Sequence, residues 1–289
     1  MKRKISIKQL CGISDEAGAS LDLQIKVHKE LGWNSLELRT IHHQPLHHLS
    51  DIEIEAVLEN IQQNGMKVPV IASSIGNWST TISAPLENDL LELEQLIRFG
   101  KKVGTRYIRI MSYPNADFSD RDWELEVKRR VCLLAKIAFD NGIKILHENC
   151  HGWAASDPNR ALALVEATEG KGFGLLFDIG NPTAHQYDGL NYFQKILQHI
   201  EHIHIKDAVT PKRGRQDFFT FPGEGNTPLL EYIDLLLATG YEGLYSIEPH
   251  ISLIPHKSGQ ENLRADLPNS YLEYGERFIS LLGDRFENI

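Results

Sequence analysis

Cysteine is scarce in this chain of 289 residues. Its three cysteines, Cys11, Cys132 and Cys150, are odd in number and widely spaced along the sequence. They offer neither a disulfide framework nor the closely spaced cysteine pairs of a zinc-binding knuckle. The chain therefore does not fit the small disulfide-bonded or zinc-finger classes, and we expect a reducing compartment.

The sequence also lacks long hydrophobic runs and long basic runs. The basic segment MKRKISIKQL has no apolar stretch of the signal-peptide kind, and no run of about 18 apolar residues exists that would span a membrane. The net charge is −9, and no basic stripe interleaved with aromatic residues offers a footprint for nucleic-acid phosphates. We therefore expect a cytoplasmic protein without membrane or nucleic-acid partners.

Hydrophobic residues make up 42% of the chain, and no low-complexity linker divides it, so we expect a single domain over 1–289. Strand-like runs alternate with helical ones at the spacing of a (β/α)₈ TIM barrel, in which one unit takes about 30 residues. The competing fold is a doubly wound open sheet, but no GxGxxG follows the first strand. The eight expected barrel strands are QLCGIS, SLELRT, VPVIAS, YIRIMS, IKILHE, GFGLLFD, HIHIKD and LYSIEP.

Helical periodicity and capping residues separate these strands. Apolar residues recur at the spacing of one helix face over 86–97 and 127–138. The pairs Asp157-Pro158 and Thr227-Pro228 are typical of an N-cap followed by proline in the first helical turn. The last helix is expected from near Ser270 to Leu282. Four glycines are expected to end helices, namely Gly32, Gly65, Gly104 and Gly142.

Two long segments, 208–226 and 249–269, follow the last two predicted strands. Long loops in compact domains often form functional lids, and both are expected on the face where TIM barrels keep their active sites. Arg213 and Arg215 in the first loop are candidates to bind a phosphate or carboxylate of a substrate. Exposed arginines of this kind are more often simply solvated.

Four of the predicted strands end in a side chain that can bind a metal. Glu148, Asp178, His204 and Glu248 are spaced by 30, 26 and 44 residues. Because strand ends meet at one rim of a barrel, this spacing predicts that the four side chains converge. Three carboxylates and an imidazole indicate one divalent cation, Mn²⁺ first, with Mg²⁺, Co²⁺, Fe²⁺ or Zn²⁺ as alternatives. Taken singly, each side chain is also explained by a salt bridge, a turn or a packed core histidine.

Two of these carboxylates, Glu148 and Glu248, end strands on opposite sides of the predicted barrel mouth. A substrate held between them would present opposite faces to the two groups. One carboxylate can then remove a proton next to a carbonyl and the other can return it, while the cation stabilises the enediolate between these steps. The alternative is that both residues are only metal ligands or only structural.

Other polar residues near the strand ends are candidates to contact a substrate. His202 and Lys206 share the strand parity of His204, so both are expected to face the barrel interior. A salt bridge at the barrel rim explains Lys206 equally well. Two further candidates follow metal-binding positions in sequence, with packing in a loop as the alternative, namely His151 and Asn181.

Two groups of charged or titratable residues have structural explanations. Glu37 and Arg39, at the end of the second predicted strand, are expected to form an ion pair under the pocket. The segment HHQPLHH is expected to be an exposed loop that binds metal only adventitiously. Its histidines are His42, His43, His47 and His48.

These features resemble the xylose isomerase-like TIM barrels, and within them the sugar phosphate isomerase/epimerase family, which is related to ketose 3-epimerases. The resemblance covers nearly the whole chain, from GISDEAG and LGWNSLELR to HIHIKD, PGEG and GYEGLYSIEPH. It implies a metal site of Glu148, Asp178, His204 and Glu248, with proton transfer by the two glutamates. The chain departs from the family pattern at Asn181, where many epimerases have a histidine that touches the substrate.

The expected activity is that of a metal-dependent isomerase or epimerase that moves a proton next to a carbonyl of a small sugar or keto-sugar through an enediolate. A dehydratase or lyase acting on a keto-sugar or inosose-like substrate is the first alternative, because it begins with the same proton abstraction. A sugar-binding barrel without catalysis is the second. DNA cleavage is disfavoured, because VPVIAS and YIRIMS lack the histidine ligands of the nuclease members. The partner is a small carbohydrate, and a homo-oligomer is left open.

Overall fold

The computed structural model describes residues 3–211, 219–251 and 266–287. Within them, parallel strands form an eight-stranded sheet in the order β1-β12-β9-β8-β7-β6-β5-β2. An isolated parallel bridge between Ile13 and Glu37 joins the two ends of this order, so the sheet closes into a barrel. The strands are β1 (Leu10–Gly12), β2 (Ser35–Leu38), β5 (Lys67–Ala72), β6 (Tyr107–Ser112), β7 (Lys144–Gly152), β8 (Phe173–Asp178), β9 (Ile200–Ile205) and β12 (Leu244–Ile247).

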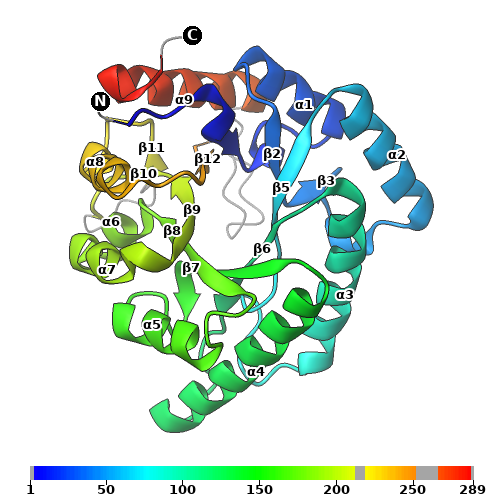
Figure 1. The fold of residues 1–289 in the computed structure, drawn as a ribbon, viewed down its shortest axis with the longest axis vertical. Coiled ribbons are helices and arrows are strands. Elements are labelled where there is room, and N and C mark those ends of the chain that lie inside the picture. Colours follow the sequence, from blue (N-terminus) through cyan, green and yellow to red (C-terminus); the bar gives the residue numbers. More distant parts are fainter. Residues whose placement is uncertain (1–2, 212–218, 252–265, 288–289) are drawn as a thin grey trace.

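Helices surround the barrel on its outer side (Figure 1). The last helix packs beside the first, and Ile5 bridges to Phe286, so the two ends of the described chain complete the ring. The prediction of a TIM barrel is confirmed, and the doubly wound open sheet is ruled out. The helices are α1 (Leu21–Glu30), α2 (Asp51–Gln63), α3 (Leu86–Val103), α4 (Asp120–Asp140), α5 (Pro158–Ala167), α6 (Asn181–His185), α7 (Gly189–Ile196), α8 (Leu229–Thr239) and α9 (Leu267–Leu282).

Short elements follow several barrel strands. Two antiparallel hairpins, β3 (Thr40–Ile41) with β4 (Gln44–Pro45) and β10 (Asp207–Ala208) with β11 (Phe219–Thr220), follow β2 and β9. Both lie at the C-terminal ends of barrel strands, which is the face where TIM barrels build their sites. The 3₁₀ helices are η1 (Ile7–Gln9), η2 (Ser14–Glu16), η3 (Leu46–His48), η4 (Leu197–His199) and η6 (Gly283–Arg285).

Capping residues explain where the helices begin and end. The Asp157 carboxylate accepts a hydrogen bond from the N–H of Asn159, and Pro158 is the first residue of α5, as predicted. Gly104 ends α3 with φ at 75°, a left-handed conformation that a side chain would disfavour. Local sequence therefore decides these boundaries.

Two helix starts differ from the predictions. Helix α9 begins three residues before Ser270, because the Asp266 carboxylate accepts a hydrogen bond from the N–H of Asn269 and so caps an additional turn. Thr227 does not cap α8. Its hydroxyl instead accepts a hydrogen bond from the N–H of Ala208, so a contact with the preceding loop replaces the helix cap.

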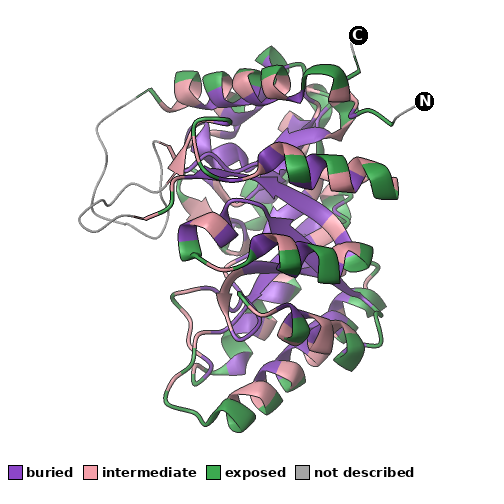
Figure 2. Ribbon diagram, turned by 90° about the vertical axis from the view of Figure 1, so that its left-hand side faces the viewer, coloured by how far each residue is buried: buried purple, intermediate pink, exposed green. Residues whose placement is uncertain are grey.

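The barrel strands and the inner faces of the helices consist mostly of buried residues, while the outer helix faces are exposed (Figure 2). Phe177 of β8 points outward and its ring packs against Tyr192 and Phe193 of α7. Its neighbour Asp178 points into the barrel mouth, because successive strand residues face opposite sides. Among the described residues, no helix combines the length and apolar character needed to cross a membrane.

The two predicted lids lie partly outside the described residues, which leave out 212–218 and 252–265. Arg213 and Arg215 are therefore not placed. A single domain over the whole of 1–289 stays a prediction.

Candidate active site

The four predicted metal ligands converge at the C-terminal ends of four neighbouring strands. Glu148 lies on β7, Asp178 ends β8, His204 lies on β9 and Glu248 follows β12. His204 is the register partner of Asp178 on one side and of Ser246 on the other, so pairing of the strands aligns the side chains. One ligand atom from each of the four side chains lies within 4.8 Å of the other three.

Each of these four side chains has a buried atom that has no hydrogen-bond partner within the described part of the chain. Such atoms are costly, because burial removes their hydrogen bonds to water. Three carboxylate oxygens and one imidazole nitrogen are donors that divalent cations accept. The residues present therefore fit a divalent cation. The atoms are Glu148 Oε2, Asp178 Oδ2, His204 Nδ1 and Glu248 Oε2.

Lys206 offsets part of the negative charge of this cluster. Its Nζ lies 2.6 Å from Asp178 Oδ2 and 2.5 Å from Glu248 Oε2, at angles outside those of hydrogen bonds. Burial alone would lower the pKa of Lys206, but the carboxylates around it, Asp178 first, raise its pKa well above the ordinary value. Burial alone would also lower the pKa of His204, but nearby carboxylates, Glu37 first, raise it well above the ordinary value. The cluster therefore favours positive charge at its centre.

The buried carboxylates differ in acidity. Burial raises the pKa of Glu248, but Lys206, His250 and His204 together outweigh it and hold that pKa well below its ordinary value. Burial also raises the pKa of Glu148, but Arg109, whose Nε lies 3.2 Å from Glu148 Oε2, and His204 together outweigh it, so the net pKa is lowered. For Asp178 burial prevails over Lys206, and the pKa rises to about 6. Glu148 and Glu248 are therefore ionised at neutral pH.

Glu37 lies beneath the cluster in the barrel interior. Its Oε2 is 2.8 Å from Nε2 of His202, and its Oε1 is 3.0 Å from Nε2 of His204. The expected ion pair between Glu37 and Arg39 is therefore wrong, because two histidines occupy both carboxylate oxygens. Arg39 instead donates two hydrogen bonds to Asp15, at 3.0 and 2.8 Å.

A cavity of about 110 Å³ opens onto the cluster. Three of the predicted substrate-binding residues line it, namely His151, Asn181 and Lys206. The amide Nδ2 of Asn181 lies 3.4 Å from Glu148 Oε1, and the His151 ring packs edge-on against Trp78. His202 is buried below the cavity, against Glu37, and does not belong to the described lining.

Sequence analysis overlooked several residues that line this cavity, among them Trp78, Arg109 and His250. Arg109 is a buried charge within the otherwise apolar run YIRIMS, and that contrast is a signal that sequence alone offers. His250 has a positive φ of 50°, and Glu16 accepts its backbone N–H at 2.7 Å and contacts its Nδ1 at 2.9 Å. A strained histidine held on two sides indicates a constrained cavity wall.

A second chamber of about 250 Å³ adjoins the first, and three residues line both chambers, namely Arg39, Trp78 and Arg109. Glu92 of α3 borders the second chamber and accepts hydrogen bonds from the N–H and the hydroxyl of Ser74, at 2.7 and 2.5 Å. His47, expected to be exposed, is half-buried there, with Nδ1 3.5 Å from Glu92. Polar groups thus continue well beyond the four-residue cluster.

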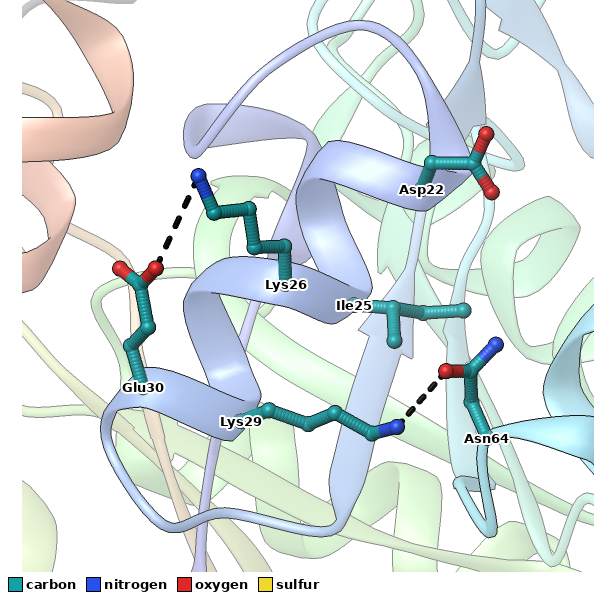
Figure 3. Close-up of a pocket in the computed structure, with 6 residues that line it drawn as sticks. All are labelled: Asp22, Ile25, Lys26, Lys29, Glu30 and Asn64. Atoms are coloured by element: carbon teal, nitrogen blue, oxygen red, sulfur yellow. Dashed lines mark hydrogen bonds and ion pairs between the residues drawn. The ribbon is translucent and has the colours of Figure 1, made fainter.

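A surface groove on α1 has none of this chemistry (Figure 3). Lys26 lies 3.8 Å from Glu30, and Lys29 donates a hydrogen bond of 2.7 Å to Asn64. Exposed pairs of this kind contribute little to stability or binding. The groove lies on the outer ring of helices, away from the strand ends, so it does not compete with the barrel mouth as a candidate site.

Residues 25–267 match the model of the family described as xylose isomerase-like TIM barrel. Among curated relatives, an inosose dehydratase from Geobacillus thermodenitrificans is 26% identical over 144 residues, which cover 45% of this chain and 48% of that protein. The chain thus spans about half the length of the curated relatives it matches. The name inosose dehydratase describes that relative.

Solved structures share the whole fold at low sequence identity. L-ribulose 3-epimerase is 17% identical with a TM-score of 0.73, and the match covers 96% of this chain and 95% of that one. The IolI protein with a bound zinc atom is 15% identical with a TM-score of 0.74, over 97% of this chain and 100% of that one. At these identities the likeness establishes the fold and leaves the activity to the site itself.

Proposed function

The chain belongs to the xylose isomerase-like TIM barrel family, and on that premise we propose that it is a divalent-metal-dependent sugar isomerase or epimerase. The reaction would move a proton next to a carbonyl of a small sugar or keto-sugar. The observation that supports this most is the convergence of Glu148 and Glu248, both with lowered pKa, on a cavity whose metal-donor atoms accept no hydrogen bond from any described residue.

In this proposal the cation is held by Glu148, Asp178, His204 and Glu248. When bound, it would polarise a substrate carbonyl and offset the negative charge that develops on it. Mn²⁺ remains our first expectation from the donor set, with Mg²⁺, Co²⁺, Fe²⁺ and Zn²⁺ as alternatives. The zinc atom in the IolI structure is the reason to retain Zn²⁺ among the alternatives.

Glu148 and Glu248 are proposed to move the proton. One ionised carboxylate takes a proton from the carbon next to the carbonyl. The other glutamate, which must first take up a proton from water, gives that proton to the opposite face and so inverts the centre. Delivery of the abstracted proton to the neighbouring carbon, with transfer of a hydroxyl proton to the carbonyl oxygen, instead exchanges aldose and ketose. Asn181, near Glu148 Oε1, would keep that carboxylate oriented, and Lys206 and His151 would bind substrate hydroxyls at the cavity wall.

The non-reacting end of the substrate is proposed to lie in the second chamber. Asp15 and Glu92 bring carboxylates to that chamber, and such groups accept hydrogen bonds from sugar hydroxyls. Arg39 and Arg109 line the same chamber and balance these two carboxylates, so a neutral polyhydroxylated end is compatible with it. Arg213 and Arg215, proposed from sequence to bind a phosphate or carboxylate, lie outside the described residues. A phosphorylated substrate therefore stays an alternative.

A dehydratase acting on a keto-sugar or inosose-like substrate is the second candidate, favoured by the similarity to inosose dehydratase. It begins with the same proton abstraction and ends with loss of a hydroxyl instead of return of a proton. A panel of keto-sugars incubated with metal-loaded protein in D₂O separates these activities. Solvent deuterium in a sugar of unchanged composition supports the epimerase, and loss of water supports the dehydratase. Bound metal without exchange in any sugar supports a sugar-binding barrel.

Replacing Glu148 or Glu248 by Gln tests the proton transfer directly. Each change keeps the size of the side chain but removes the base, so turnover of the sugar identified above should fall by about 10² to 10⁴. The losses should not multiply in the double variant, because the two groups act as a unit. The exposed Glu94→Gln is the matched control and should behave as wild type. Near-normal turnover in both active-site variants with metal retained would sink the mechanism.

A further inference from the structure

Glu37 is a fully buried carboxylate in the barrel interior, on a strand that carries none of the four proposed ligands. Both of its oxygens are occupied, one by Nε2 of His202 at 2.8 Å and the other by Nε2 of His204 at 3.0 Å. An ionised carboxylate only accepts hydrogen bonds, so each Nε2 donates its proton to Glu37. The two imidazole rings are 5.4 Å apart and nearly perpendicular, which lets one carboxylate serve both.

This arrangement determines which nitrogen of His204 faces the cluster. Its Nδ1 lies 3.4 Å from Glu248 Oε2 and 3.8 Å from Glu148 Oε1, and it makes no hydrogen bond to any described residue. A ring nitrogen binds a metal only through a lone pair that carries no proton. With the Nε2 proton held by Glu37, Nδ1 is the nitrogen that can provide that lone pair.

We propose that Glu37 is a positioning residue that selects Nδ1 of His204 as the metal ligand and fixes the orientation of its ring. The inference rests on the proposed metal-dependent function. His202 acts in the same unit, because its bond to Oε2 prevents the carboxylate from turning away from His204. Carboxylates that hold ligand histidines in this way typically change metal affinity by about 10- to 100-fold when they are replaced.

One alternative has to be distinguished from this proposal, namely that the same three side chains bind a metal ion themselves. Glu37, His202 and His204 each offer an atom within 4.8 Å of the others, so they could themselves surround an ion. Such an ion would need free lone pairs on the Nε2 atoms that face Glu37. In the proposed arrangement each Nε2 instead carries the proton that it donates to Glu37. A second equivalent of tightly bound metal, lost on replacement of Glu37, would overturn the proposal in favour of this deeper site.

The first measurement uses the wild-type protein loaded with ¹¹³Cd²⁺ and labelled with ¹⁵N at histidine. One-bond coupling between cadmium and nitrogen identifies the bound ring nitrogen, and we expect Nδ1 of His204, with a proton retained on Nε2. Coordination through Nε2 would overturn the inference while leaving the metal-dependent function intact. Failure of the wild type to bind metal, with no turnover of any sugar, would overturn both.

The second measurement compares the affinity of Glu37→Gln and Glu201→Gln for Mn²⁺ by competition with a chelator. A glutamine amide has one acceptor oxygen and one NH₂ donor, so in Glu37→Gln one of the two histidine N–H groups would face the NH₂ group. The two rings are then no longer held together, and the affinity for Mn²⁺ should fall by about 10- to 100-fold. Glu201 lies on the same strand as His204 but pairs with Lys144 away from the cluster, so its variant should match wild type. Wild-type affinity in a folded Glu37→Gln protein would overturn the proposal. If that variant does not fold, the cadmium experiment on the unaltered chain decides.

Discussion

The two halves of the barrel contribute to the same cavity in different ways. Strands β7, β8, β9 and β12, with the residue that follows β12, form a ligand half, which carries the four proposed metal ligands. Strands β1, β2, β5 and β6, with the loops that follow them, form a support half. From that half Arg109 contacts Glu148, Arg39 lies 3.7 Å from Glu248, and Glu37 binds His204.

The difference teaches how a barrel keeps several carboxylates ionised in its interior. Burying unpaired carboxylates is expensive, and removing the partner of a buried charge typically costs about 3–5 kcal/mol. In this chain the ligand half supplies most of the negative charge at the cluster, and the support half brings two arginines against it. A site of this kind is therefore shared, because the ligand half carries the four proposed ligands and the support half carries residues that hold them in place.

The largest effect is expected from changes in the ligand half. Asp178→Ala and His204→Ala each remove a donor and leave the remaining carboxylates unbalanced, so bound metal should fall to near zero. Elemental analysis of protein prepared without a His tag measures this. Asp140→Ala, at an exposed ion pair of α4, is the control and should retain metal. Unchanged metal content in both cluster variants would show that the ligand half does not bind the metal.

A change in the support half should leave metal binding in place but shift acidity. In Arg109→Leu the guanidinium that lowers the pKa of Glu148 is gone, so that pKa rises. A base with a raised pKa ionises only at higher pH, and the acidic limb of the pH profile of kcat/KM should move upward. The exposed Arg106→Leu is the matched control on the same segment. An unshifted profile in Arg109→Leu would show that the support half does not tune the base.

The ligand half could be predicted from sequence because each ligand stands at the end of a strand-like run, and the runs recur at barrel spacing. The geometry of convergence then follows from the fold alone. The roles of the ligands stay predictions, as do the cytoplasmic location, the absence of nucleic-acid partners and the oligomeric state.

The support half was not predicted correctly, and the reason is physical. Glu37 and Arg39 are neighbours of the same parity, so an ion pair was the simplest local expectation. Closure of the barrel instead brings His202, 165 residues away in sequence, against Glu37. Arg109 gave a signal as a charge within an apolar strand, but its partner Glu148 becomes evident only when β6 and β7 pair. Partnerships across the barrel depend on closure, which single-strand patterns do not encode.

The smallest effect is expected at the histidine-rich segment that follows the support half. His42, His43 and His48 are exposed, and His42 and His43 have positive φ values of 53° and 62°. Asn tolerates that conformation better than most residues, so the triple variant His42→Asn, His43→Asn, His48→Gln removes the imidazoles with little backbone strain.

Exposed histidines that are not held in place bind metal weakly, whereas a buried set of donors retains it through a brief chelator wash. The triple variant should therefore lose only the metal that washing also removes from wild type, and its washed metal content and melting temperature should be unchanged. Elemental analysis before and after the wash measures the two fractions separately. If the washed variant lost its tightly bound ion while Asp178→Ala kept it, the metal would belong to this surface segment, and the contrast between ligand and support halves would fail.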